Sequence, residues 1–128
     1  MGRSKPNFVP FPPWETLNTN GREKKYVRMG ITLMNSIPVK RLSGTAFKIM
    51  TYMKKQSGQS QQFEFPRTEY IQITTEPTFN RAIKELIGAG IIDVVERNRN
   101  LRKPNVYSWS LRWKNIHYEV TDALKGRQ

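Results

Sequence analysis

The stretch TEPTFNRAIKELIGAGII, residues 75 to 92, decides the fold that the rest of the sequence predicts. Its large apolar residues recur at i, i+3, i+4, i+7 and i+8: Phe79, Ala82, Ile83, Leu86 and Ile87. This spacing is typical of an amphipathic helix with one face against a core. Thr75 can cap its start, and Pro77 fits a first turn, where its missing N–H costs nothing. Gly88 or Gly90 can adopt the left-handed conformation that ends a helix.

The opposite side of the same helix carries short polar and basic side chains, namely Thr78, Asn80, Arg81 and Lys84. Such groups suit phosphate oxygens and base edges, and a helix about 10 to 12 Å across fits the major groove of B-DNA. Asn can pair bidentately with adenine and Arg with guanine. Arg81 has an alternative use in an ion pair with Glu85, one turn further on, and the sequence leaves both uses open. We therefore predict a DNA recognition helix.

The charge of the chain also points to a polyanionic partner. The 128 residues include 22 Lys and Arg against 10 Asp and Glu, which gives a net charge of +12. Nucleic acid is favoured over a membrane surface because the sequence has no long apolar run, no signal sequence and no lipidation motif. Since the chain has no cysteine, disulfides and zinc fingers are excluded, which is consistent with a cytoplasmic protein.

Residues for catalysis are missing from the sequence. The single histidine, His117, lies near the C-terminus, so no Ser-His-Asp triad, metal site or histidine-paired nicking site can be assembled. No G-x-x-x-x-G-K-[ST] loop is present, and the acidic residues show no paired spacing for acid-base chemistry. We expect a binding protein that is not an enzyme and needs no cofactor.

Two further helices are predicted before the recognition helix. Residues 42 to 55 carry a wide apolar stripe, with Ser43 or Thr45 as the cap. Residues 63 to 65 alternate as a short strand, and Pro66 then fits the first position of a second helix over residues 66 to 73. Residues 26 to 33 alternate as a half-buried strand would, followed by an irregular or briefly helical run that ends before Pro38.

Two strands are predicted after the recognition helix, over residues 91 to 96 and 106 to 111. The connecting loop is rich in positive charge, with Arg97, Arg99, Arg102 and Lys103, and has no acidic residue. A basic hairpin in this place predicts a wing that contacts the minor groove or its phosphates; the alternative is a solvated loop that only aids solubility. Additional candidate contacts to the DNA backbone are Arg67, Lys40 and Arg41.

These elements predict an α+β winged helix-turn-helix with three main helices and a three-stranded antiparallel sheet. Residues 1 to 25 form a Pro-rich basic arm, in which we expect Trp14 to pack on its own domain. Residues 26 to 115 form the domain, and residues 116 to 128 a tail that is either a short helix or without structure. An oligomer is compatible with the sequence, through residues 26 to 33 or 116 to 124.

The phrase Thr78-Phe79-Asn80-Arg81-Ala82-Ile83-Lys84-Glu85-Leu86, closed by Gly90-Ile91-Ile92, resembles the recognition helix of winged-helix regulators of the MarR and GntR kind. The segments SGTAFKIMTYM, FPRTEY and KPNVYSWSLRWK resemble winged-helix domains of replication initiators and replisome organisers of bacterial plasmids, phages and conjugative elements. This resemblance implies sequence-specific binding to double-stranded DNA, in transcriptional regulation or at an origin of replication or transfer.

Two other functions remain open at the level of sequence. The chain could be an adaptor whose winged helix docks other proteins of a replication or transfer complex. It could also bind single-stranded nucleic acid, which needs aromatic side chains along an exposed basic groove. The sequence places most of the aromatic residues at buried-face positions, so single-strand binding is the least favoured of the three.

Overall fold

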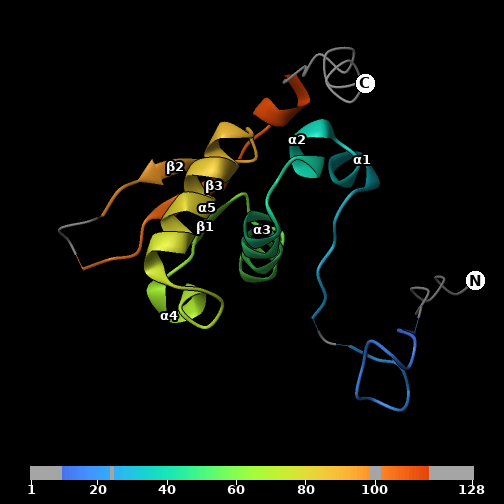
Figure 1. The fold of residues 1–128 in the computed structure, drawn as a ribbon. Helices are drawn as coiled ribbons and strands as arrows, with labels where there is room; N and C mark the ends of the chain where they lie inside the picture. The colour runs from blue at the N-terminus through green and yellow to red at the C-terminus, as the bar shows by residue number, and fades with distance from the viewer. Residues whose placement is uncertain (1–9, 24, 99–101, 116–128) are drawn as a thin grey trace, which may run out of the picture.

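The computed structural model of the chain describes residues 10–23, 25–98 and 102–115, and within them it shows an α+β fold (Figure 1). Two long helices pack against each other and against a three-stranded antiparallel sheet. The elements in chain order are α1 (Ile31–Met34), α2 (Ile37–Lys40), α3 (Gly44–Ser57), β1 (Gln62–Glu64), α4 (Arg67–Tyr70), α5 (Glu76–Gly88), β2 (Ile92–Glu96), β3 (Val106–Trp109) and the 3-10 helix η1 (Arg112–Asn115).

Helix α5 is the element predicted from residues 75 to 92, and both of its ends follow from the sequence. Thr75 is the N-cap in an extended conformation, although its side chain makes no capping hydrogen bond, and Pro77 occupies the first turn. At the other end, Gly90 has a φ of 76°. The N–H of Gly90 donates to Ile87 O at 3.0 Å and the N–H of Ile91 donates to Leu86 O at 3.0 Å. These two bonds form a Schellman motif, so Gly90 is the residue that ends the helix and directs the chain into β2.

Helix α3 packs against α5 and is tied to it by a polar contact at its start. The Ser43 hydroxyl accepts the N–H of Ala46 at 3.2 Å, as predicted for the cap. Glu85 of α5 accepts the backbone N–H of Ser43 at 2.5 Å and the Ser43 hydroxyl at 2.8 Å. A carboxylate at a helix N-terminus satisfies donors that the helix leaves unpaired and interacts favourably with the helix dipole. Glu85 therefore joins the start of α3 to the middle of α5.

The core lies where α3, α5 and the sheet meet. Met50 of α3, Leu86 of α5 and Ile92 of β2 are all fully buried there. Near the start of α5, the rings of Tyr70 and Phe79 stack with centroids 3.8 Å apart. This shared core fixes the position of α5, so its outer face is held by the packing of its inner face.

The sheet has the strand order β1-β3-β2, with both pairs antiparallel. Tyr107 of β3 lies between Phe63 of β1 and Val94 of β2. The β2–β3 ladder shifts between Val94 and Glu96, next to the loop that joins the two strands. Such an irregularity increases the local twist and re-aims the end of a hairpin.

The predicted set of three main helices is wrong, because only α3 and α5 are long and α4 is a single turn. Pro66 is the N-cap of α4 and not its first helical residue. One feature disfavours a longer α4. The following Ile71, Ile73 and Thr74 are β-branched residues, which lose side-chain freedom in a helix.

The strand expected over residues 26 to 33 is also wrong. Residues 25–30 have no regular structure, and α1 begins at Ile31. Pro38 does not end a helix but lies in the first turn of α2, where Ser36 is the cap and accepts the N–H of Val39 at 3.4 Å. Pro in a first helical turn loses no hydrogen bond, so the Ser-x-Pro order starts a helix here.

Residues 10–21 form a loop that closes on itself and lies apart from the helices in Figure 1. The N–H of Phe11 donates to Gly21 O at 2.7 Å. Gly21 has a φ of 74°, and a Cβ there would lie 2.6 Å from the Cβ of Pro10, so only glycine fits. The expectation that Trp14 packs on the domain is wrong, because 84% of its surface is exposed. Residues 1–9 of the predicted arm and the whole predicted tail, residues 116–128, lie outside the described residues.

No helix in the described part of the chain combines the length and the apolar composition needed to cross a bilayer.

Candidate nucleic-acid interface

The outer face of α5 presents the side chains predicted to contact DNA. Asn80, Arg81 and Lys84 are exposed, and Thr78 is half-buried at the flank of the helix. Because these positions alternate at helical spacing with the buried Phe79 and its partners in the core, the helix separates an apolar inner face from a polar outer face.

A row of hydroxyl groups orients Arg81. The Thr75 hydroxyl donates to Thr78 Oγ1 at 3.0 Å, and Arg81 Nη2 donates to the same oxygen at 3.1 Å. Glu85 binds Ser43 instead, and among the described residues no ion pair joins Arg81 to Glu85. The alternative ion pair of Arg81 with Glu85 is therefore not formed, and the Arg81 guanidinium lies at the surface with no carboxylate partner in the part of the chain that the structure describes.

The loop between β2 and β3 presents the second group of predicted contacts. Arg97, Arg102 and Lys103 are exposed, whereas Arg99 lies outside the described residues. Arg102 has a φ of 53°, a left-handed conformation that residues other than glycine seldom adopt. Such strained backbone concentrates at functional sites, where the surrounding structure holds it in place.

Two asparagines that the sequence analysis did not single out hold the base of this loop. Asn98 is only 7% exposed, and its N–H donates to Asn105 Oδ1 at 2.8 Å. Its side-chain Nδ2 donates to the carbonyl oxygen of Pro104 at 2.9 Å. The only signal in the sequence was an asparagine at each end of the basic loop, and asparagine is a common turn residue. These bonds fix the two ends of the loop to each other.

The positive charge of Arg97 acts on the phenol of Tyr107, which is buried in the sheet. Burial raises the pKa of Tyr107, while the hydrogen bond to Asn105 and the positive charge of Arg97 oppose the rise. Tyr107 of β3 therefore joins the hairpin loop, through the hydrogen bond with Asn105, to the domain core.

The remaining candidates lie on two sides of α5. Arg67 is exposed at the first position of α4, which precedes the start of α5 in the chain and lies beside it in Figure 1. Lys40 and Arg41 are exposed at the end of α2, on the side of α5 away from the hairpin loop (Figure 1). The structure therefore does not bring Lys40 and Arg41 together with the hairpin.

Arg112 is a third residue that the sequence analysis missed. Its guanidinium donates to Asp93 Oδ1, with Nε at 3.0 Å and Nη2 at 2.5 Å. Nη2 also donates to the carbonyl oxygens of Ile87 at 2.9 Å and Ile92 at 3.1 Å. Arg112 thereby ties the end of α5 to the start of β2. No local pattern indicates this contact, because 19 positions separate Arg112 from Asp93.

Within residues 10–23, 25–98 and 102–115, no cluster of three or more His, Asp or Glu side chains comes together that could hold a metal ion. Comparisons with protein-family models, with curated proteins and with solved structures gave no match for this chain.

Proposed function

We propose that the chain is a winged-helix protein that binds double-stranded DNA in a sequence-specific manner. We assign it to a bacterial plasmid, phage or conjugative element, where it acts in transcriptional regulation or at an origin of replication or transfer. Helix α5 is the recognition helix of this proposal, and the β2–β3 hairpin is its wing.

The observation that carries the proposal is the free cationic outer face of α5. Arg81 is held by Thr78 and not neutralised by Glu85. Asn80 and Lys84 are exposed on the same side of the helix. An Arg or Asn that reaches a base edge in the major groove contributes about 1 to 3 kcal/mol of discrimination. These side chains therefore have both the chemistry and the exposure that base recognition needs.

The hairpin supports the proposal through charge. Arg97, Arg102 and Lys103 are exposed on a loop whose base is fixed by Asn98. Basic side chains in such a loop suit the phosphates or the narrow minor groove beside a recognition helix. If α5, α4 and the hairpin together make about six phosphate contacts, affinity should fall about a thousandfold between about 50 and 200 mM salt.

The proposal is tested by titrating the protein against two duplexes of equal length and composition. One carries the DNA that flanks the gene, and the other carries the same bases in scrambled order. We expect tighter binding to the natural duplex and a steep loss of affinity with salt. Equal binding to both duplexes would rule out sequence specificity. No binding to either duplex at low salt would rule out DNA binding as the function.

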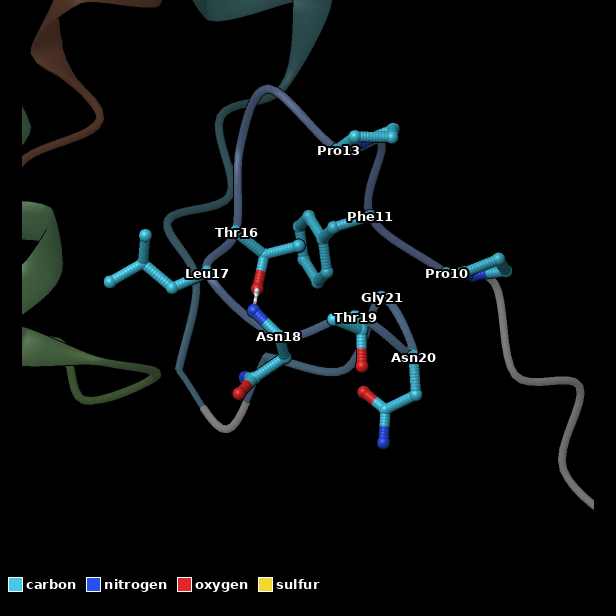
Figure 2. A pocket seen from close by; sticks show the side chains of 9 residues that line it. All are labelled: Pro10, Phe11, Pro13, Thr16, Leu17, Asn18, Thr19, Asn20 and Gly21. Atoms are coloured by element: carbon cyan, nitrogen blue, oxygen red, sulfur yellow. Dashed lines mark hydrogen bonds between the residues drawn. The ribbon is translucent and has the colours of Figure 1, made fainter.

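An adaptor function is the second candidate, and one observation favours it. The closed loop of residues 10–21 exposes the apolar side chains of Trp14 and Leu17. Figure 2 shows Leu17 pointing away from the loop, while the Thr16 hydroxyl accepts the N–H of Asn18 at 3.1 Å inside it. Exposed apolar side chains of this kind often contact proteins. If Arg81→Ala combined with Lys84→Ala leaves duplex affinity unchanged, the adaptor function is favoured.

A further inference from the structure

A second basic surface lies at the opposite end of α3 from Ser43, and the proposed function does not use it. An open groove of about 890 Å³ lies between residues 25–28, the last turn of α3, the polar turn that follows it and strand β3. Four cations line it, namely Lys25, Arg28, Lys54 and Lys55, together with the rings of Tyr26 and Trp109. The remaining lining is mostly Ser and Gln side chains of residues 56–61.

The charge of this groove, here called the Lys25–Lys55 groove, has one sign. No Asp or Glu lines it, and among the described residues none of its four cations forms an ion pair. Lys54 and Lys55 lie in the last turn of α3, where a positive charge interacts favourably with the C-terminal end of the helix dipole. This interaction does not explain the positions of Lys25 and Arg28, because both belong to a segment outside any helix. Four unneutralised cations around one concave surface favour an anionic ligand that follows the groove.

The two rings of the groove differ in what they can do. Trp109 is held in place by three contacts. Its Nε1 donates to the Ser57 hydroxyl at 3.0 Å. The centroid of its ring lies 5.0 Å from the ring centroid of Phe63 and 4.8 Å from the Lys54 ammonium. Tyr26 is 60% exposed and touches only the ring of Phe11 among the described aromatic rings, with centroids 5.4 Å apart. Trp109 thus forms a rigid wall that positions Lys54, and Tyr26 offers a ring face to a ligand.

We propose that the Lys25–Lys55 groove binds single-stranded nucleic acid, with the four cations on the phosphates and an unpaired base stacked on Tyr26. A duplex cannot use the ring, because its base faces are stacked inside the helix. A basic groove with an exposed aromatic ring is the arrangement that binds unpaired strands with little sequence preference. The sequence had disfavoured this function because most of the aromatic residues fall at buried-face positions, whereas Tyr26 is exposed.

The inference is independent of the duplex-binding face, so the two can be tested separately. The probe is a fluorescein-labelled oligothymidylate of about 12 nucleotides, within the range of sites seen for such proteins. Its binding to the full chain is followed by anisotropy at low salt. We expect Tyr26→Ala to weaken binding about fivefold or more and Tyr26→Phe to retain it, because stacking needs the ring and not the hydroxyl. Trp14→Ala removes another exposed aromatic ring, outside the groove, and should have no effect.

The cations are tested by Lys25→Gln combined with Arg28→Gln. Each phosphate contact on a single strand contributes about 0.7 to the slope of log affinity against log salt, so this variant should flatten the slope by about 1.4. The matched control, Lys48→Gln combined with Lys114→Gln, removes the same net charge outside the groove and should leave the slope nearly unchanged.

Duplex titrations with the same variants complete the test. The inference predicts that the groove variants keep the duplex affinity of the unsubstituted chain. An equal loss for oligothymidylate and duplex would overturn it, because the groove would then be a general electrostatic surface. It would also be overturned if Tyr26→Ala bound oligothymidylate as tightly as the unsubstituted chain, or if the unsubstituted chain did not bind it at all. Neither of these last two results would affect duplex recognition by α5.

Discussion

The molecule has two basic surfaces, the outer face of α5 and the Lys25–Lys55 groove, and they are built in different ways. The side chains on α5 stand on a helix whose opposite face is buried in the core, and Thr78 holds the guanidinium of Arg81. Two cations of the groove, Lys25 and Arg28, stand on a segment without regular structure. Both surfaces carry positive charge, but only α5 fixes its polar groups relative to one another.

This difference matters for what each surface can recognise. Base recognition needs donors and acceptors held to within a fraction of an ångström, which a helix packed on a core provides. Binding to a phosphate backbone needs only positive charge, and the cations do not have to be fixed relative to one another. We therefore expect sequence preference from α5 and salt-dependent, sequence-tolerant binding from the groove. The following predictions test that division.

The largest effect is expected where the core holds α5. Leu86 is fully buried, so Leu86→Ala should lower the free energy of unfolding by about 2 to 5 kcal/mol, through lost burial and the cavity that remains. Urea denaturation followed by circular dichroism measures this. Ile71→Ala is the control, because Ile71 is 44% exposed and should cost less than about 1 kcal/mol. A similar small cost for both variants would show that α5 is not anchored as described.

Removing the cations of α5 should separate the two surfaces most clearly. Arg81→Ala combined with Lys84→Ala should lower affinity for the preferred duplex about tenfold or more, since Arg81 alone can contribute about 1 to 3 kcal/mol. Affinity for oligothymidylate should be unchanged, and gel-shift and anisotropy titrations measure the two. The double variant Lys48→Gln with Lys114→Gln again serves as the charge-matched control. A parallel loss of both affinities would mean that the chain has one continuous basic surface.

Glu85 should contribute to stability but not to duplex binding. Glu85→Gln weakens the charge-assisted bonds to the backbone N–H and hydroxyl of Ser43, and we expect a loss of about 1 kcal/mol in the free energy of unfolding. The exposed Glu64 of β1 is the control, and Glu64→Gln should change stability by less than about 0.5 kcal/mol. If Glu85→Gln left stability intact but altered duplex affinity, Glu85 would act through Arg81 and not through α3.

The smallest effect concerns pH and the base of the hairpin. Burial raises the pKa of Tyr107 above 10.0, so the folded chain keeps a proton that the unfolded chain gives up. The associated stability is fully present below pH 10.0 and is lost as pH rises through the folded pKa. Burial lowers the pKa of Lys54 below 10.5, so its contribution rises with pH below 10.5 and opposes that of Tyr107.

We therefore expect Tyr107→Phe to lose less stability than the unsubstituted chain between about pH 9 and pH 11. Urea titrations at the two pH values measure the difference. Lys54→Met, which removes the opposing group, should lose more than the unsubstituted chain. Identical pH profiles for all three proteins would show that neither group is coupled to folding.

The parts of the fold that could be predicted are those written in local sequence. The apolar spacing over residues 79 to 87 predicted α5, and of the two glycines proposed for its end, Gly88 and Gly90, it is Gly90 that is left-handed. Of the two proposed caps, Ser43 and Thr45, it is Ser43 that starts α3, and runs of β-branched and aromatic residues predicted β2 and β3. In each case, the spacing of the buried side chains predicts the type of element, and a nearby cap or turn residue predicts where it ends. Residues close in the sequence therefore suffice to predict these elements.

The errors arose where distant contacts decide the structure. The alternation of residues 26 to 33 looked like a strand, but within the described part of the chain no strand pairs with it, and Tyr26 and Val27 are exposed. The proline at position 66 was expected inside α4, but it is the N-cap of a helix that ends at Tyr70. For the site, the sequence alone could not decide whether Arg81 contacts DNA or pairs with Glu85. The residue that Glu85 binds, Ser43, lies 42 positions away in the chain. The outward positions on α5 followed from periodicity, and their contact with DNA stays a prediction.

The central claim is that the outer face of α5 lies against duplex DNA, and site-directed cleavage tests it most directly. Because the chain has no cysteine, Gly88→Cys gives a single attachment point for an iron chelate that produces hydroxyl radicals. Gly88 is exposed on α5, at helical spacing from Arg81 and Lys84, and a Cβ there meets no atom within 4 Å. Tyr52→Cys places the same chelate on the outer face of α3.

We predict that the chelate at position 88 cuts a few adjacent nucleotides inside the bound duplex site, and that the chelate at position 52 does not cut there. Cleavage from position 52 alone, or equal cleavage from both positions, would contradict the assignment of α5 as the recognition helix.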